Sequence, residues 1–125
     1  MYLPHIVFLA ITIEQLKNIS KPLVEDLAKI CECGTDNITL ELPNSTFVFN
    51  GEETEAFPPI EVKWFERGQE IRDQFAQTLT AYIMNFDLPE VEVVFTVFSE
   101  STYYNNRKSC CFRLKSIAFF SPIST

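Results

Sequence analysis

A proline followed by the chain's only histidine stands close to the start of the sequence. Pro4 and His5 follow Met1-Tyr2-Leu3 and precede an apolar run. A proline that is the first residue of a chain carries a secondary amine, which can accept a proton as a base. A proline inside a peptide bond is a tertiary amide with no basicity and no N–H group. The chemistry predicted for Pro4 therefore depends on whether the residues before it are retained.

Four other positions carry side chains suited to binding or proton transfer. Histidine exchanges protons near neutral pH, so His5 could carry a proton, or it could be a hydrogen-bonded structural residue of an early strand. Arg67 could hold a carboxylate, or it could be a surface arginine where a helix begins. Tyr103 and Tyr104 could close an aromatic pocket and donate a hydroxyl, or they could pack at an interface. The sequence leaves both interpretations open for each residue.

The cysteines do not indicate a metal or redox site. Cys31 and Cys33 are separated by one residue, and Cys110 and Cys111 are adjacent. Zinc knuckles and thioredoxin-like motifs need a gap of two residues. We expect reduced, structural thiols and neither a metal nor a cofactor.

The composition of the chain argues against several classes of partner. The formal net charge of −7 disfavours nucleic acid, because phosphate binding needs a cationic surface. The early apolar run over 6–11 is too short to span a bilayer, and it lacks the flanks of a signal peptide. We expect a cytoplasmic protein without a membrane partner. The 12 Phe residues among 125 predict an apolar interface between subunits.

Apolar spacing predicts the secondary structure of the first half. A strand over 5–8 is followed by Thr12, which with Gln15 matches a capping box at the start of a helix. Apolar residues at helical spacing continue to Ile30, and Gly34 is expected to end the helix. Pro22 lies inside this helix and is expected to kink or split it. Alternation over 38–42 predicts a half-buried strand.

The second half repeats this plan, with a strand over 60–65, a helix over 71–86 and a strand over 91–98. Adding 56 to first-half numbers places Ile6 on Val62 and Leu23 on Leu79, so the sequence predicts two copies of one β-α-β unit. We expect an α+β fold in a single domain over 1–125, with repeats at about 4–50 and 58–100 and a tail over 107–125. Strands within a copy should be parallel, and both helices should cover one face of a four-stranded sheet. Self-association would cover the other face. A ferredoxin-like monomer is the alternative.

Several segments in this order resemble the tautomerase superfamily, whose two-repeat members include macrophage migration inhibitory factor (MIF). The Pro-His start is followed by "TLEL" at 39–42, "IEVKWF" at 60–65, "RGQE" at 67–70 and "YY" at 103–104. These segments are most similar to a small bacterial branch of unassigned function, and the similarity covers residues 4–105. The tail "RKSCCFRLKSIAFFSPIST" lies beyond it, and its alternation predicts an edge strand that packs on a neighbouring subunit.

The resemblance implies a homotrimer with sites between subunits, near an N-terminal proline. It implies that Pro4 is a general base acting on a small carboxylated keto–enol substrate, with Arg67, Tyr103, Tyr104 and His5 as binding groups. One alternative is a catalytically inactive trimeric scaffold. Another is a protein that binds a small ligand.

The sequence departs from the family pattern at two places. Tyr2 is too large for routine removal of the initiator methionine, so Pro4 remains an amide unless translation starts at a leucine codon at position 3. A start there would give Met-Pro-His, and removal of the methionine would expose Pro4. The second departure is at Thr35 and Asp36, where better-known tautomerases often have a cation.

Overall fold

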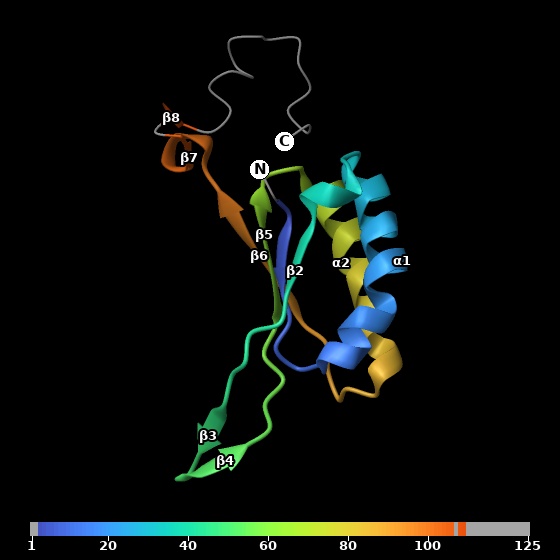
Figure 1. Cartoon of the computed structure of the whole chain (residues 1–125), viewed down its shortest axis with the longest axis vertical. Helices are drawn as coiled ribbons and strands as arrows, with labels where there is room; N and C mark the ends of the chain where they lie inside the picture. The colour runs from blue at the N-terminus through green and yellow to red at the C-terminus, as the bar shows by residue number, and fades with distance from the viewer. Residues whose placement is uncertain (1–2, 107, 110–125) are drawn as a thin grey trace.

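The computed structural model describes residues 3–106, 108 and 109 and shows an α+β fold (Figure 1). Tail residues 110–125, with the predicted edge strand and Cys110-Cys111, lie outside the described residues. In the described part of the chain, no helix is long and apolar enough to cross a membrane. The elements are β1 (His5–Val7), α1 (Ile13–Cys31), β2 (Thr39–Glu41), β3 (Phe47–Phe49), β4 (Glu52–Thr54), β5 (Ile60–Phe65), α2 (Gln69–Ile83), β6 (Val93–Phe98), β7 (Tyr104–Asn105) and β8 (Lys108–Ser109).

Four strands form the main sheet, in the order β2-β1-β5-β6. β1 is parallel to β2, β5 is parallel to β6, and the central pair β1 and β5 is antiparallel. Both helices cover the same face of this sheet, and they run in opposite directions (Figure 1). The predicted pair of β-α-β units, with parallel strands within each unit, is confirmed.

A local two-fold axis relates the two units. Ile6 pairs with Val62 at the centre of the sheet, and these residues are 56 positions apart. In the helix layer, the Tyr82 hydroxyl donates a 2.6 Å hydrogen bond to Asp26 Oδ2, again across 56 positions. Equivalent residues meet in this way only where an axis passes between them. The offset in the sequence therefore corresponds to a real symmetry of the fold.

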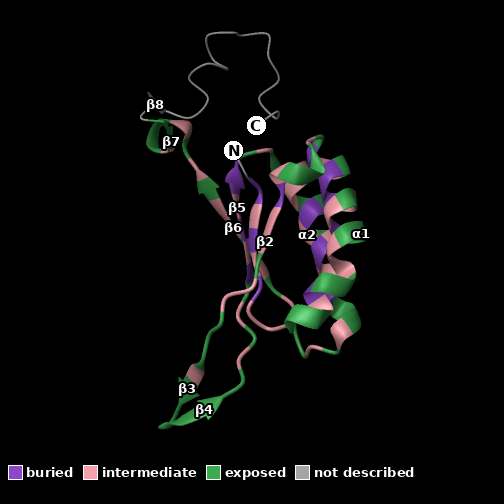
Figure 2. Ribbon diagram, viewed as in Figure 1, coloured by how far each residue is buried: buried purple, intermediate pink, exposed green. Residues whose placement is uncertain are grey.

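The core lies between the sheet and the helices, where Figure 2 shows the buried residues. Trp64 of β5 is fully buried, and its ring lies 5.1 Å from Phe75 of α2 and 4.8 Å from Phe95 of β6. Alternate residues of a strand point to opposite faces, so His5, Glu41 and Lys63 lie on the face that no helix covers. The uncovered face therefore carries polar side chains at these positions.

Helix α1 differs from its predicted form at two positions. Its capping box is confirmed, with both reciprocal hydrogen bonds between Thr12 and Gln15. The helix ends at Cys31, where Glu32 adopts the left-handed conformation (φ 54°), so the predicted end at Gly34 is wrong. Pro22 does not split the helix. The fully buried Leu23 and Leu27 hold the segment against the core on the C-terminal side of the proline.

A β-hairpin made of β3 and β4 extends away from the sheet, and we call it the arm (Figure 1). Asn50 and Gly51 at its tip have positive φ angles of 54° and 82°, as the tight hairpin turn requires. Val48 and Phe49 remain 66% and 76% exposed. The sequence analysis missed this hairpin, although the Asn-Gly pair is a strong hairpin signal.

Candidate active site at the start of strand β1

Pro4 lies at the end of the sheet where β1 begins and β5 finishes. Its side chain is almost completely buried, and its carbonyl oxygen accepts a 3.0 Å hydrogen bond from the Thr39 backbone. The backbone of Pro4 is therefore fixed beside β2. Leu3 precedes it in the chain, so the Pro4 nitrogen shown here is an amide.

Leu3 and Phe65, the last residue of β5, form a buried cluster at the same end of the sheet. Phe98 at the end of β6 and Tyr103 just beyond it pack against this cluster. The Phe65 and Phe98 ring centroids are 6.2 Å apart, and those of Phe65 and Tyr103 are 5.1 Å apart. The centroids of Phe98 and Tyr103 are separated by 5.6 Å. We call these three rings the aromatic cage. Only 5% of Leu3 remains exposed.

Arg67 follows β5 at this end of the sheet, and its guanidinium lies on the helix side. The carbon of the guanidinium is 5.6 Å from the Trp64 ring centroid. Its Nη1 donates a 3.4 Å hydrogen bond to the carbonyl oxygen of Cys31, the last residue of α1. Within the described residues, Nε and Nη2 are buried and have no hydrogen-bond partner. Arg67 thus has two donor nitrogens without a partner, from which a carboxylate could accept hydrogen bonds.

The thiols near Arg67 are free and poorly ionised. Burial raises the pKa of Cys31 from 9.0 to about 12, although the positive charge of Arg67 lowers it in part. Burial also raises the pKa of Cys33. A thiolate is the reactive form of cysteine, so these side chains fit a structural role. No group of histidine, cysteine and carboxylate side chains suited to a metal occurs among the residues described.

The other predicted residues lie apart from Arg67. His5 points to the uncovered face of the sheet, where its Nε2 lies 2.7 Å from Glu41 Oε1. On that same face, the Thr96 hydroxyl donates a 2.7 Å hydrogen bond to Glu61. Tyr104 is 67% exposed, whereas Tyr103 belongs to the aromatic cage. The structure therefore brings Pro4, Arg67 and Tyr103 to one end of the sheet and separates the two tyrosines.

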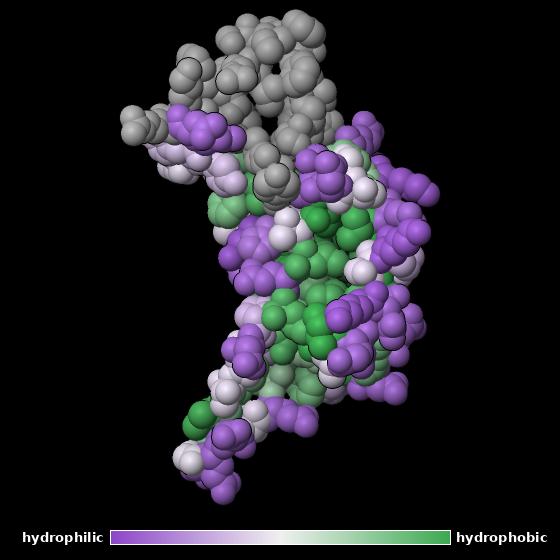
Figure 3. Space-filling model, in the orientation of Figure 1, coloured by the Kyte–Doolittle hydropathy of each residue, from purple (hydrophilic) through white to green (hydrophobic). Residues whose placement is uncertain are grey.

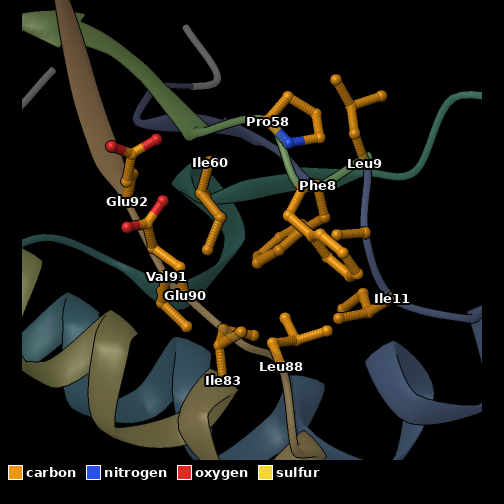
Figure 4. A pocket seen from close by; sticks show the side chains of 12 residues that line it. Phe8, Leu9, Ile11, Pro58, Ile60, Ile83, Leu88, Glu90, Val91 and Glu92 are labelled. Atoms are coloured by element: carbon orange, nitrogen blue, oxygen red, sulfur yellow. The ribbon is translucent and has the colours of Figure 1, made fainter. Parts of the chain in front are cut away.

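A small cavity lies at the opposite end of the sheet (Figure 4). Its lining is mainly apolar and includes Phe8, Ile60 and Leu88, with Glu90 and Glu92 also present. The cavity has a volume of about 10 Å³, which is about the space of one water molecule. It is too small to hold a substrate in this conformation.

Comparison with known families and structures places this geometry in context. A family model described as "Domain of unknown function (DUF1904)" matches residues 3–109. The chain belongs to the DUF1904 family. A DUF1904 domain from Sebaldella termitidis has a solved structure that is 33% identical, with a TM-score of 0.75. The alignment covers 83% of this chain and 96% of that one. No match was found among curated proteins.

The DUF1904 chain also shares its fold with tautomerase superfamily proteins. MIF from Toxoplasma gondii is 14% identical with a TM-score of 0.59, over 85% of this chain and 99% of that one. A protein described as "Pt0534 Inactivated by 2-Oxo-3-pentynoate" is 15% identical with a TM-score of 0.61, over 85% and 96%. The predicted tautomerase-like fold is confirmed.

The sequence analysis of this DUF1904 chain did not identify part of the site. Leu3, Phe65 and Phe98 were not predicted as site residues, because the sequence does not show which residues an isolated apolar side chain contacts. The positions of Phe65 and Phe98 at strand ends were visible in the sequence. Their meeting in one cluster with Leu3 depends on the β5–β6 register, which pairs Phe65 with Phe98.

Proposed function

We propose that this protein, when Pro4 is its first residue, is a tautomerase-like isomerase of small 2-oxo acids. The observation that carries this proposal is the position of Pro4, which is fixed at the start of β1 beside an aromatic cage. Further support is the description of a structural neighbour as inactivated by 2-oxo-3-pentynoate, a 2-oxo carboxylate.

Pro4 is proposed to act as the base. A free α-amine has a reference pKa of about 7.7–8.0, and burial in apolar surroundings lowers such a value because it disfavours the charged form. The nitrogen lone pair takes a proton from C3 of the substrate, and the C–H electrons form a C2–C3 double bond. The carbonyl oxygen at C2 then accepts a proton to give the enol. No electrons leave the substrate, so no cofactor is proposed.

Arg67 is proposed to bind the substrate carboxylate. Its unpartnered Nε and Nη2 would supply the N–H donors, and the cation–π contact with Trp64 helps to position the guanidinium. Tyr103 would donate its hydroxyl to the developing enolate oxygen. Tyr104 and His5 remain proposed contacts at the junction with a neighbouring subunit, His5 being held by Glu41.

A homotrimer is proposed as the working assembly. Val48 and Phe49 on the arm are among the most exposed large apolar side chains of the described residues. Figure 3 shows an apolar spot on the arm and a larger apolar area above it. A two-stranded hairpin has little stability alone, so contact with another subunit would stabilise the arm.

Light scattering tests the proposed assembly. The chain should behave as three copies of 14.4 kDa, and Phe49→Glu should shift it toward the monomer because a charge would be buried at the contact. Glu53→Gln on the same arm is the control and should leave the mass unchanged. A monomeric parent protein would contradict the homotrimer.

The catalytic proposal is tested with two forms of the protein. One is the full chain, and the other begins Met-Pro-His so that removal of methionine exposes Pro4. Intact mass must confirm the processing. Proton NMR in D₂O then measures the loss of the C3 protons of 2-oxo acids, and the short form should be faster by about 10²–10⁴-fold. Equal rates in both forms would disprove the role of Pro4.

A second candidate function is favoured by the contacts of Leu3. In the chain that retains it, the Pro4 nitrogen is an amide and the cage is filled. That form is proposed to be a non-catalytic scaffold or binding protein. Selective binding of a small carboxylate at Arg67 by the full chain, without exchange at C3, would support it.

A further inference from the structure

The contacts of Leu3 indicate what the aromatic cage is built to bind. Leu3 and Phe65 form a buried cluster of their own, separate from the main core, with Phe98 and Tyr103 packed against it. Phe98 and Tyr103 are only half-buried, so the cage lies near the surface. Removing the Leu3 side chain would therefore open a pocket at the surface and leave the main core intact.

The position of Leu3 directly before Pro4 also indicates where a ligand of the cage would lie relative to the Pro4 nitrogen. The carbonyl carbon of Leu3 is bonded to the Pro4 nitrogen. In a chain that begins at Pro4, a substrate would approach the free nitrogen from this same side. The Leu3 side chain therefore enters the cage from the side on which a substrate would bind. The isobutyl group of Leu3 thus shows the size and shape of apolar group that the cage accepts next to the Pro4 nitrogen. Arg67 lies at the same end of the sheet but on its helix side, where its buried Nε and Nη2 have no partner among the described residues.

We infer that the aromatic cage of Phe65, Phe98 and Tyr103 is the side-chain pocket of the substrate site, and that Leu3 occupies it in cis. The preferred substrate is a small 2-oxo acid with a branched aliphatic side chain of about the size of isobutyl. This inference rests on the proposed function for the reaction, but the binding preference of the cage is independent of catalysis.

The selectivity follows from apolar burial. Pyruvate carries a methyl group beyond its carbonyl, whereas 4-methyl-2-oxopentanoate carries an isobutyl group. Burying the three further carbons should improve binding by roughly 50-fold. Both compounds present the same carboxylate and carbonyl, so the ratio between them reports on the cage alone.

The first experiment measures binding without catalysis. In full-length Leu3→Ala the Pro4 nitrogen is still an amide, while the cage is open. Ligand-observed NMR should show that this variant binds 4-methyl-2-oxopentanoate roughly 50-fold more tightly than pyruvate, and that the parent chain binds neither in the cage. Leu9→Ala, at the opposite end of β1, is the matched control and should show no such preference. Equal binding of the two acids by Leu3→Ala would overturn the inference.

The second experiment uses the short form that begins at Pro4, which opens the cage without a substitution. Its rate of C3 exchange should be higher for 4-methyl-2-oxopentanoate than for pyruvate by a similar factor. Tyr103→Ala should reduce that ratio toward one, whereas Tyr103→Phe should keep it. The ratio of the two exchange rates does not depend on the folded fraction of a variant, because both acids are measured on the same sample. A partly unfolded variant therefore still reports the preference of the cage.

The two experiments separate the two proposals. Selective binding by Leu3→Ala together with no exchange in the short form would support the cage and disprove Pro4 as the base. Exchange that is equally fast for both acids, with no selective binding by Leu3→Ala, would support the proposed function and overturn the cage as the substrate pocket.

Discussion

The two ends of the sheet are built on one plan and differ in what the chain places there. At one end β1 begins and β5 finishes, and at the other β5 begins and β1 finishes, because the two strands are antiparallel about the local axis. The first end holds Pro4, Arg67 and the aromatic cage. The second holds a cavity of about 10 Å³ that has a proline, Pro58, in its lining.

This difference shows how a repeated unit becomes specialised at one end. Pro58 lies in the middle of the chain, so its nitrogen is always an amide. Pro4 lies near the start, so its nitrogen becomes an amine if three residues are absent. The symmetry of the fold supplies equivalent frameworks at both ends, and the position along the chain decides where proline chemistry is available.

The largest expected effect comes from blocking the Pro4 nitrogen with one residue. A form that begins Met-Ala-Pro-His should exchange the C3 proton of a 2-oxo acid about 10²–10⁴-fold more slowly than the form with free Pro4, since the base is lost. Pro58→Ala in the free-Pro4 form is the control at the other end and should keep the rate. NMR exchange measures both, and a large loss in Pro58→Ala would contradict the proposed difference between the ends.

Removing large core rings should destabilise both ends, by unequal amounts. Trp64 and Phe8 are equivalent under the offset of 56, and both are almost fully buried. Each change to alanine should lower the free energy of unfolding by about 3–5 kcal/mol. Trp64→Ala should cost more because it also removes the support of Arg67. Urea unfolding followed by circular dichroism measures the difference, and a larger loss in Phe8→Ala would contradict it.

The thiol at the end of α1 should make stability depend on alkaline pH. The pKa of Cys31 is raised by burial from 9.0 to about 12, so the folded state holds its proton where the unfolded state has lost it. The contribution is fully present below pH 9 and is lost as the pH rises toward 12. At pH 10 the loss should be about 1–2 kcal/mol.

Urea unfolding of Cys31→Ala between pH 8 and pH 10 isolates this contribution. The fall in unfolding free energy should be smaller in Cys31→Ala than in the parent by that amount. Asp87→Asn, at the equivalent position after α2, is the control and should retain the parental slope. An unchanged slope in Cys31→Ala would show that the thiol is not the titrating group.

The smallest expected effect lies on the local axis itself. Tyr82→Phe removes the hydroxyl that bonds to Asp26 and should lower the free energy of unfolding by about 1 kcal/mol. The position is equally far from both ends of the sheet, so the exchange rate of the short form should stay the same. A marked fall in that rate would mean that the helix pair also controls the site.

Periodicity in the sequence was enough to predict the main elements of this fold. The capping residues Thr12 and Gln15 marked the start of α1, and the alternation over 60–65 matched β5 residue for residue. The offset of 56 predicted a symmetry that the structure contains. These features depend on the burial pattern of each element and on residues close in sequence, so they can be predicted from short stretches of the chain.

Only the tertiary structure decided which of the candidate residues lie together. Arg67 turns toward the end of α1, His5 turns toward Glu41, and Leu3 enters a cage of rings from distant strands. Each of these contacts joins residues at least 30 positions apart, and it depends on strand register and on how the helices pack on the sheet. A burial pattern says that a side chain is covered, whereas the identity of its neighbour is fixed by packing between elements.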